Sequence, residues 1–569
     1  MTSLTVTNIN FTQNYQNVDA SMIYLSSVKS VTFVNHTYSN LQGLSTEGAG
    51  TWIELAAIDL ASTQNTTISG IQITNSEVGF IKINSLTNSL SSPKQVLISE
   101  FSYSDSYFAN PADLVDSGGI EFEGELYFVL TGLKFSEIEF ASRGNLLLFQ
   151  HQLSTNVLVT NSEFSNLKGA GIYIESYNKQ QKDLQTRVRI QHSTFNSLNG
   201  GYNSLINIYE GGYLEVENCT FTNISKYEDG TVFYAGSLKS TSIFTNSVFR
   251  NNTGAEGAIF FIDSESKVEC HNCIINNNFG VSGGVVATRG GGYFEFYNST
   301  IFNNYALAYP VASMQEGVIS SKINNWEIYD NIGFTRDEIT DQLILATCQQ
   351  LWFISAAYIE NIQNQSSVFT TTEAKSLFKL VLASLEISNS TRIHEQSALV
   401  NAFISSVIIS DSEIYNVEVL QPSIKISSSN LTISGTQIYN VTNPSSSDFI
   451  FVLLDSVVVI QDTSFTASSS VFLNSLTSEI SVEGLVFSDV QSGKYLLKIS
   501  DWVNVSLSNI TVVNSIVSGE ALFNVRNTHV DSISNIVISA IENTIFSLIR
   551  STVDQMTDCE ISSWYSFIR

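Results

Sequence analysis

Three glutamates occupy the same position of a repeated phrase in this 569-residue chain. Glu215, Glu269 and Glu295 each stand three residues before an asparagine, with apolar neighbours on both sides. Two carboxylates that face each other across a sugar can hydrolyse a glycosidic bond, and clustered carboxylates beside a basic group can hold calcium for a lyase reaction. Glu121 and Glu123 form a second pair on one strand face. We favour the interpretation that both groups lie on solvated strand faces.

The histidines and cysteines offer no convincing ligand spacing for a metal. Residues 270–273 form a single CxxC, which is weak evidence for metal or redox chemistry. Cys219, Cys273 and Cys559 occupy the position where other copies of the phrase have Ser or Thr, so we expect small buried core residues. His192 replaces an asparagine, which indicates a buried, hydrogen-bonded bend rather than a catalytic base. The sequence therefore predicts no catalytic residues, no metal ligands and no cofactor.

The phrase changes its apolar parity at one fixed position. The apolar side chains fall at Val157, Val159 and then Phe164, so the odd series before Asn161 becomes an even series after it. Strand residues alternate faces, so this change requires a bend at which one residue leaves the β region. Asn, Asp and Gly tolerate the left-handed conformation best. We expect positive φ and a ladder of amide hydrogen bonds at five equivalent asparagines: Asn161, Asn218, Asn246, Asn272 and Asn298.

About 21 such bends can be placed between Asn8 and Asp558, with a mean spacing near 27 residues. We place three of them at Ser30, Asn361 and Asn389. A period of roughly 20 to 50 residues indicates a repeat architecture. Short strands and tight bends fit a parallel β-helix, in which each strand pairs with its copy one coil away at about 4.8 Å. The alternative, an array of β-sandwiches, gives no reason for one bend residue to recur. The predicted fold is an all-β, single-stranded parallel β-helix of about 21 coils.

Composition favours one continuous solenoid over residues 1–569. The chain contains only 5 prolines, and no Pro-rich or Gly/Ser-rich linker interrupts it. A net charge of −27 argues against nucleic-acid binding, and no stretch of about eighteen apolar residues predicts membrane insertion within this segment. Longer periods predict side insertions near residues 41–61, 105–119, 177–187 and 331–350.

Three pieces in the middle of the chain carry a resemblance to a known family. Residues 249–252 read Phe-Arg-Asn-Asn, residues 257–259 read Gly-Ala-Ile and residues 283–286 read Gly-Gly-Val-Val. These pieces resemble the FxxN and GGA[ILV] repeats of polymorphic outer-membrane proteins. More broadly, the chain resembles the pectin-lyase-like right-handed β-helices of large surface proteins of ciliates and other protists. The resemblance implies a right-handed helix and a cell-surface or adhesive role, and it carries over no catalytic residues.

Pectin hydrolases of this fold resemble one another through NTD, DD, GHG and RIK motifs. None of these strings occurs in the chain. Most acidic residues are scattered, as at Glu163, Glu413 and Asp462. We therefore expect that the protein is not an enzyme.

Glycosylation sequons are frequent, and many fall five residues from a bend. We expect these to lie at strand ends and to carry sugar if the chain is secreted: Asn35, Asn65, Asn223, Asn251, Asn430, Asn440 and Asn504. Other sequons are themselves bends and are expected to be bare, because their side chains belong to the ladder: Asn218, Asn298, Asn389 and Asn509.

These observations favour an extracellular or cell-surface structural or adhesive glycoprotein. The chain enters its first coil without a signal peptide and shows no polar cap after its last coil. We therefore expect either continuation in a longer chain or self-association end to end into a fibre. The alternative is a carbohydrate-binding or carbohydrate-active β-helix of the polysaccharide lyase or hydrolase kind, which an exposed carboxylate cluster would indicate. A receptor-like module would show an apolar or aromatic groove instead.

Overall fold

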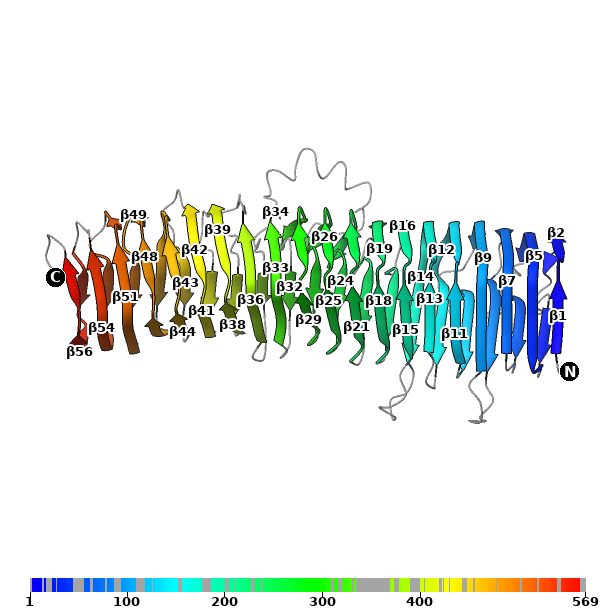
Figure 1. The fold of residues 1–569 in the computed structure, drawn as a ribbon, viewed down its shortest axis with the longest axis horizontal. Helices are drawn as coiled ribbons and strands as arrows, with labels where there is room; N and C mark the ends of the chain where they lie inside the picture. Colours follow the sequence, from blue (N-terminus) through cyan, green and yellow to red (C-terminus); the bar gives the residue numbers. More distant parts are fainter. Residues whose placement is uncertain are drawn as a thin grey trace. The chain divides into compact units, whose positions relative to one another are not determined.

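The computed structural model contains only strands and turns among the residues that it describes (Figure 1). The chain divides into two compact units, Met1–Ile274 (unit 1) and Ile275–Arg569 (unit 2). No described residue belongs to a helix long and apolar enough to cross a membrane. The described residues are 3–12, 15–16, 23–26, 28–43, 56–61, 65–76, 79–85, 94–108, 118–124, 126–151, 156–176, 186–199, 204–209, 211–226, 231–236, 239–308, 312–315, 320–329, 332–333, 369–372, 378–388, 400–403, 405–418, 422, 424–428, 430–442, 448–453, 456–476, 478–501, 504–518, 521–539 and 544–562.

Alternating burial forms the strands, and a left-handed residue ends each alternation. In β18 (Tyr213–Glu217), Leu214 and Val216 are buried while the residues between them face outward. Asn218 then takes a φ of +53°, and the buried series resumes with the opposite parity at Cys219 and Phe221. The apolar pattern and the bend residue therefore fix together which side chains enter the core.

A second left-handed bend follows the first by five residues wherever the structure describes both positions. In one coil of unit 1 the pair is Asn218 and Asn223, with φ of +53° and +55°. Each coil thus has a fixed corner of two bends, and three strand faces: one before the first bend, one after it, and a third that completes the turn. The second bends are Asn40, Asn75, Asp105, Glu137, Asn166, Ser197, Asn223, Asn251, Asn277, Asn303, Asn416, Asn440, Ala467, Asp489 and Asn514.

In unit 1, ten strands stack in parallel on the face before the first bend: β1 (Ser3–Thr7), β5 (Ser30–Gly43), β7 (Asn65–Ser76), β9 (Lys94–Phe108), β11 (Leu126–Thr131), β13 (Asn156–Thr160), β15 (Arg187–Gln191), β18, β21 (Thr241–Thr245) and β25 (Lys267–His271). The second face continues β5, β7 and β9 and adds β2 (Asn10–Thr12), β12 (Lys134–His151), β14 (Glu163–Ser176), β16 (Thr194–Asn199), β19 (Thr220–Ser225) and β22 (Val248–Arg250). The third face continues β12 and β14 and adds β4 (Ile23–Ser26), β6 (Ala56–Ala61), β8 (Gly79–Ser85), β10 (Gly118–Gly124), β17 (Ile206–Tyr209), β20 (Phe233–Gly236) and β24 (Phe260–Ile262). Two short strands follow the second bend, β3 (Tyr15–Gln16) and β23 (Thr253–Glu256), and β26 (Ile274–Asn276) contains the division between the units.

Unit 2 also stacks ten parallel strands on its first face: β29 (Tyr293–Tyr297), β33 (Ser320–Tyr329), β36 (Phe378–Ser388), β38 (Ser405–Ser410), β41 (Asn430–Ser434), β44 (Ser456–Gln461), β47 (Ser478–Glu483), β51 (Asn504–Val513), β54 (His529–Ser539) and β56 (Thr552–Thr557). Its second face continues β33, β36, β51 and β54 and adds β30 (Thr300–Phe302), β39 (Glu413–Glu418), β42 (Gln437–Thr442), β45 (Ser464–Thr466), β48 (Val486–Ser488) and β57 (Glu560–Ser562). Its third face consists of β28 (Val286–Thr288), β32 (Ala312–Gln315), β35 (Phe369–Thr372), β37 (Val400–Phe403), β40 (Ile424–Ser427), β43 (Asp448–Leu453), β46 (Val471–Leu476), β50 (Leu497–Ser500), β53 (Phe523–Arg526) and β55 (Phe546–Ile549). Short strands after the second bend are β27 (Phe279–Ser282), β31 (Tyr305–Ala308), β34 (Ile332–Gly333), β49 (Gln491–Ser492) and β52 (Ile516–Val517).

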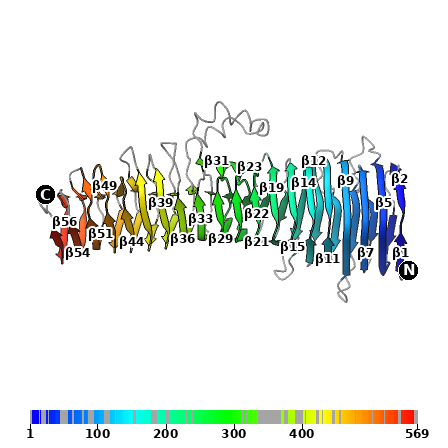
Figure 2. The same ribbon diagram turned by 45° about the horizontal axis from the view of Figure 1, so that its top comes forward.

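Within each unit, the strands of neighbouring coils lie side by side (Figure 2). The core of each unit consists of side chains that repeat at one inward position from coil to coil. In unit 1, Phe195 stacks on Phe221 with ring centroids 4.9 Å apart, and Phe221 stacks on Phe249 at 5.0 Å. These rings are within 5° of parallel and fully buried. A buried aromatic ring removes on the order of 150–250 Å² from water, so such a ladder is the main stabilising element of the coil.

In many coils the residue after the first bend is Ser, Thr or Cys, and its side chain is buried in the core. Ser247 Oγ accepts a hydrogen bond from Cys219 N at 3.3 Å and donates one to Thr245 O at 3.0 Å. Ser193 Oγ likewise accepts from Ser162 N at 3.2 Å. The buried ladder at the corner is therefore made of hydroxyl and thiol groups, which pair with backbone groups that the bend leaves without strand partners.

The prediction of a parallel β-helix is confirmed, with a small correction to the number of coils. The described strands form ten first-face strands in each unit, twenty in total, against about 21 expected coils. The missing coil lies between Asn325 and Asp411, where Ala383 pairs with both Asn324 and Ser410, so one bend position replaces two expected ones. The expected bends Asn361 and Asn389 both lie outside the described residues.

The second expected bend was also misplaced. Val34 pairs with Ser69 and His36 pairs with Ile71, so Asn35, not Ser30, lies opposite Gly70. Asn35 has a φ of +56°. Ser30 is instead the first residue of β5, because the burial of Val31 and Phe33 continues the strand to the bend.

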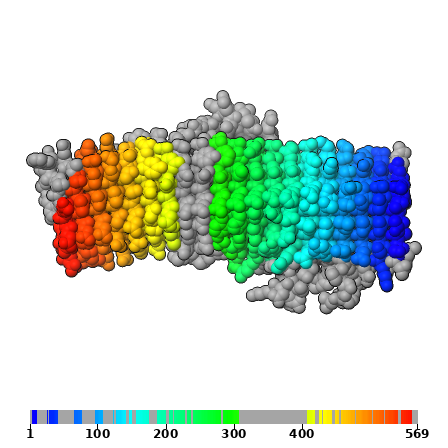
Figure 3. Space-filling view, in the orientation of Figure 1, coloured from blue at the N-terminus to red at the C-terminus, as the bar shows by residue number. Residues whose placement is uncertain are grey.

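Most of the four expected side insertions lie outside the described residues. The structure describes only their ends, which are strands or the residues next to them: 41–43 in β5, 56–61 in β6, 105–108 in β9, 118–119 in β10, 186–187 at the start of β15 and 332–333 in β34. In the space-filling view, the described residues of each coil form one band of colour (Figure 3).

Candidate functional site

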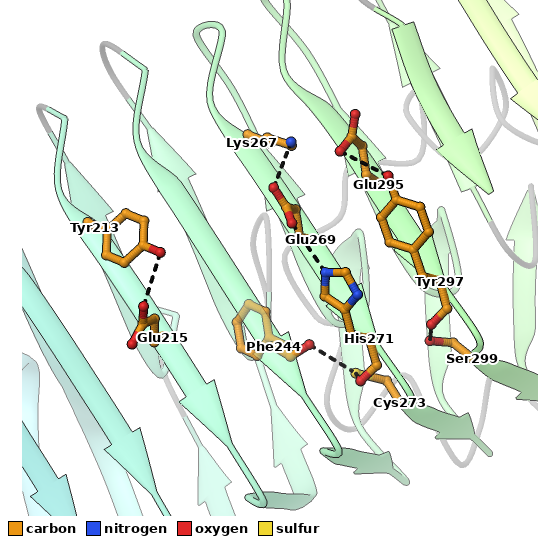
Figure 4. A network of polar contacts seen from close by, with 10 residues as sticks. All are labelled: Tyr213, Glu215, Phe244, Lys267, Glu269, His271, Cys273, Glu295, Tyr297 and Ser299. Atoms are coloured by element: carbon orange, nitrogen blue, oxygen red, sulfur yellow. Dashed lines mark hydrogen bonds and ion pairs between the residues drawn. The ribbon is translucent and has the colours of Figure 1, made fainter. Parts of the chain in front are cut away.

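The glutamates singled out in the sequence face outward on the first strand face (Figure 4). Glu215 accepts a hydrogen bond from Tyr213 Oη at 3.1 Å, and its other oxygen lies 2.5 Å from Arg189 Nε on β15. Arg187 lies over the Tyr213 ring, 5.4 Å from its centroid. Burial and the neighbouring Glu215 raise the pKa of Tyr213, so its phenol stays protonated as the donor.

Glu269 lies between Lys267 and His271 of its own strand. Its oxygens are 2.6 Å from Lys267 Nζ and 3.2 Å from His271 Nε2, as Figure 4 shows. The Lys267 and Glu269 side chains are only about one-fifth exposed. In unit 2, Tyr297 donates to Glu295 at 3.2 Å. Each of these three carboxylates is therefore already paired with a neighbour on the same strand.

The spacing of the unit 1 carboxylates does not suit hydrolysis. β21 lies between β18 and β25, so the strands of Glu215 and Glu269 are about 10 Å apart. Retaining hydrolases need carboxylates at about 5 Å, and inverting ones at about 6.5–9.5 Å. Glu121 and Glu123 belong to β10, but the structure does not describe their side chains. The paired carboxylates thus form a solvated polar lattice.

The five ladder asparagines occupy first bends, with φ between +50° and +54° at Asn161, Asn218, Asn246, Asn272 and Asn298. All five are exposed. Asn272 Nδ2 donates to Asn246 Oδ1 at 3.1 Å. The amide ladder therefore runs along the outer edge of the corner, outside the buried hydroxyl ladder.

The candidate glycosylation sites fall into two structural groups. Asn65, Asn430 and Asn504 are exposed first residues of strands, the position expected for them. The other four are left-handed bends, with φ between +52° and +56° at Asn35, Asn223, Asn251 and Asn440. We expected sequons five residues after a bend to lie at strand ends, unlike sequons at the bends themselves. This expectation is wrong, because the corner contains two bends separated by five residues.

Amides at the second bend also bond across coils. Asn440 Nδ2 donates to Asn416 Oδ1 at 2.6 Å, and Asn223 Nδ2 donates to Asn196 Oδ1 at 3.0 Å. Both bonds are exposed. Sequon asparagines at first and at second bends therefore share the same features: an exposed left-handed bend whose amides bond to the neighbouring coil.

Among the described cysteines, none forms a disulfide. Cys219 and Cys273 are buried, as expected, and Cys270 is buried too, whereas Cys559 is only partly buried, contrary to expectation. Burial raises the pKa of Cys219 to about 11 and that of Cys270 well above the usual value, so both remain thiols at neutral pH. His192 is a first bend with a φ of +49°, but it is exposed rather than buried. The correction follows from its place on the outer edge of the corner, one residue before buried Ser193.

A further group of polar side chains lies on the third face of unit 2. We call it the Asp448 cluster; its members are Asp448, Asn474, Tyr495, Lys498 and Arg526. Strand register places Asn474 beside Lys498, and Lys498 beside Asn524. Tyr495 precedes β50, and Arg526 ends β53. Four coils thus contribute side chains to one patch.

The contacts within the Asp448 cluster leave one buried acceptor unused. Asn474 Nδ2 donates to Asp448 Oδ2 at 2.7 Å, and Lys498 Nζ lies 5.8 Å from the Tyr495 ring centroid. Arg526 Nε donates to Asn524 Oδ1 at 3.0 Å. Asn474 is 8% exposed, and its Oδ1 has no hydrogen-bond donor among the described residues. A buried acceptor without a donor costs about 1–3 kcal/mol, so a ligand that donates to it would bind favourably.

Two acidic groups of the Asp448 cluster have raised pKa values. Burial raises the pKa of Asp448, and this effect exceeds the opposing hydrogen bond from Asn474 and the charges of Lys494 and Lys498. Burial also raises the pKa of Tyr495 to about 12; Asp448 raises it further, while Arg526 lowers it. Clustered perturbed carboxyl and phenol groups are typical of functional sites.

Sequence reasoning missed the Asp448 cluster because its members share no motif. Asn474, Lys498 and Asn524 come from three coils, and outward polar positions leave no trace in the apolar pattern. One signal was available. The chain has only 26 lysines and arginines, and three of them, at 494, 498 and 526, fall within about one and a half coils.

Comparison with known proteins identifies the fold. Residues 118–301 match the family model described as a right handed beta helix region, about one-third of the chain. No curated protein sequence matches the chain. The PL6 family alginate lyase AlyGC is 10% identical, with 100% of this chain and 97% of that chain covered and a TM-score of 0.24.

Two further solved structures are similar in the same way. The A-module of the mannuronan C-5 epimerase AlgE6 from Azotobacter vinelandii is 9% identical, covering 88% of this chain and 89% of that chain with a TM-score of 0.22. The tailspike protein of E. coli bacteriophage HK620, solved with a pentasaccharide, is 12% identical, covering 92% and 74% with a TM-score of 0.21. The chain is thus a right-handed parallel β-helix, and the likeness concerns the fold alone.

The expectation of a protein without enzymatic activity has to be corrected. It rested on the absence of the pectin-hydrolase strings, but the similar β-helices include a lyase and an epimerase. Both are enzymes, so the absence of one set of motifs excludes only one kind of active site on this fold. The chemistry must be judged from the residues that the coils bring together.

Proposed function

We propose that this protein is a carbohydrate-active β-helix that binds a saccharide at the Asp448 cluster. The observation that carries the proposal is the buried, unsatisfied Oδ1 of Asn474 beside the half-buried carboxyl of Asp448. A sugar hydroxyl can donate to that oxygen while a neighbouring hydroxyl bonds to Asp448. Binding sites of this kind combine a few convergent polar groups with an aromatic surface, here the Tyr495 ring.

Charge favours an acidic saccharide. Lys494 and Lys498 act on the Asp448 carboxyl and Arg526 acts on Tyr495, although the chain as a whole carries a net charge of −27. The pKa of that carboxyl is raised, which weakens its repulsion of an anion. A sugar carboxylate would accept charge-assisted hydrogen bonds from Lys498 and Arg526. Asp448 and Tyr495 are then the groups available to accept and donate protons.

The test is calorimetric binding of defined acidic and neutral oligosaccharides to the full chain, followed by assays for reducing ends and unsaturated products. Replacing Lys498 by Met should weaken binding of the acidic oligosaccharides about tenfold, which corresponds to one charge-assisted hydrogen bond of about 1.4 kcal/mol. Asp448→Asn should abolish any turnover while the chain stays folded. The matched control is Glu215→Gln, which removes a carboxylate of the polar lattice in unit 1. If neither Lys498→Met nor Asp448→Asn changes oligosaccharide binding, the proposal is contradicted.

A second candidate is a role as an extracellular or cell-surface glycoprotein. It is supported by the exposure of seven sequon asparagines: Asn35, Asn65, Asn223, Asn251, Asn430, Asn440 and Asn504. End-to-end association into a fibre, or continuation in a longer chain, would belong to this role. Intact-mass spectrometry of the native protein tests it, because attached glycans and chain ends appear in one measurement. A native mass equal to that of the bare polypeptide would argue against it.

A further inference from the structure

Two strands at the C-terminal side of unit 2 bring together a histidine and two aspartates. His529 Nε2 lies 3.3 Å from Asp531 Oδ1 and 3.3 Å from Asp554 Oδ2. One ligand atom from each residue lies within 4.8 Å of the other two. All three side chains are exposed, so a hydrated ion can reach them. This group is separate from the Asp448 cluster, and its chemistry does not depend on the proposed function.

A local irregularity of the sheet aims the aspartates at the histidine. Val505 pairs with Val530 and Ser506 with Ser532, so Asp531 is an extra residue relative to β51. On the other side, Val530 pairs with Val553 and Ser532 with Gln555. Asp531 and Asp554 therefore lie in register at the same irregularity. Bulges of this kind re-aim side chains and are frequent beside functional sites.

A hydrogen bond on the far side of the ring sets up the histidine as a ligand. His529 Nδ1 lies 2.9 Å from Thr552 Oγ1, which belongs to the same strand as Asp554. When Nδ1–H donates to this hydroxyl, Nε2 presents its lone pair to the two carboxylates. Without a cation, that lone pair and two negative oxygens would repel one another. A divalent ion at Nε2 removes this repulsion, and so does the tautomer in which Nε2–H donates to a carboxylate and Thr552 Oγ1–H donates to Nδ1.

Two of the three ligand separations match a small tetrahedral ion. A tetrahedral ion with bonds of about 2.0–2.1 Å holds its ligands about 3.3–3.4 Å apart, whereas an octahedral ion with the same bonds holds them at about 2.9 Å. Both N–O separations are 3.3 Å. One imidazole and two carboxylates suit zinc better than calcium, which prefers six to eight oxygens. We propose that His529, Asp531 and Asp554 bind a zinc-type divalent cation, with water completing its coordination.

The experiment uses the full chain, stripped of metal by a chelator and titrated with Zn²⁺ in a calorimeter and with Co²⁺ by visible absorption. The expected result is one ion per chain and an intense Co²⁺ spectrum of tetrahedral type. His529→Gln and Asp554→Asn should each weaken binding at least tenfold. Thr552→Val should weaken it less, by up to about tenfold, because it removes only the bond that orients the ring.

Asp558→Asn is the matched control. Asp558 lies on the same coil, carries the same charge and has a φ of +52°, a conformation that Asn adopts equally well. This variant should leave Zn²⁺ affinity unchanged. Absence of binding at millimolar Zn²⁺ would overturn the proposal. Equal loss in the Asp558→Asn variant would overturn it too, because it would show only attraction by surface charge.

Discussion

Single asparagines hold the corner of each coil in a conformation that most residues avoid. Asn161 is exposed and has a φ of +51°. Replacing Asn161 by Ala should lower the free energy of unfolding by about 1 kcal/mol, because an L residue other than Asn, Asp or Gly is strained there. Asn161→Gly should stay within a few tenths of a kcal/mol of the parent. Urea denaturation measures both, with Asn156→Ala at the exposed start of β13 as control. Equal effects of Ala and Gly would refute the argument.

The titration of Asp448 gives a pH dependence of definite sign. Its pKa in the folded chain lies above the unfolded value of 3.8, so the folded state binds more protons once the pH exceeds that value. The contribution of Asp448 to stability is therefore fully present below about pH 3.8 and is lost as the pH rises through the native pKa. Asp448→Asn lacks this change.

The measurement is urea denaturation of both proteins across a pH series. The stability of the parent relative to Asp448→Asn should fall as the pH rises from about 3 toward neutral. A difference that is constant, or that grows with pH, would show that the carboxyl is not held in a buried environment.

At the scale of the strand, the apolar pattern predicts the first bend because buried and exposed faces alternate strictly around it. A break in this alternation also marks the second bend. Phe164 and Leu167, like Phe195 and Leu198, are buried residues three positions apart, which strict alternation forbids. The second Asn of the FxxN motif is explained in the same way: Asn252 is fully buried just after bend Asn251.

The polar sites could not be predicted in this way. The Asp448 cluster and the His529 group are built from outward residues of neighbouring coils, and outward positions accept almost any polar residue. Which of them meet depends on coil length, since Asn474 and Lys498 are 24 residues apart but Lys498 and Asn524 are 26 apart. Register is a property of the folded sheet. Apolar periodicity determines it only for the inward side chains.

The aromatic ladder leads to a prediction for the same elements. Phe221→Ala removes a ring stacked on both sides, so it should destabilise unit 1 by about 3–5 kcal/mol. Phe221→Leu should cost less, about 1–2 kcal/mol, because it keeps most of the volume. Hydrogen exchange is the readout, and faster exchange should concentrate in β16, β19 and β22. Tyr127→Ala, at a residue 40% exposed in the same unit, should have little effect.

At the scale of the whole molecule, the chain repeats one arrangement of three faces in both units, yet its polar chemistry is local. Unit 1 carries the paired carboxylate lattice, whereas unit 2 carries both the Asp448 cluster and the His529 group. Lys498 belongs to the third face and His529 to the first face, so substitutions in the two groups should have independent effects on stability and binding although their coils are neighbours. A double variant, Lys498→Met with His529→Gln, should combine both binding defects without coupling.

The corner of two bends also divides each coil into two stretches that should differ in their tolerance of insertions and deletions. Between the bends the spacing is five residues in every coil described at both positions. The distance between successive first-bend positions instead varies from 22 residues, at Asp462 to Gly484, to 59, the separation of the paired residues Asn324 and Ala383. Losing or gaining one residue inside the corner would turn every following side chain to the wrong face. Outside it, added residues extend a loop and leave the register intact. Insertions and deletions should therefore accumulate only outside the corner. The two bends of the corner can then serve as fixed reference positions for aligning distant relatives of this chain.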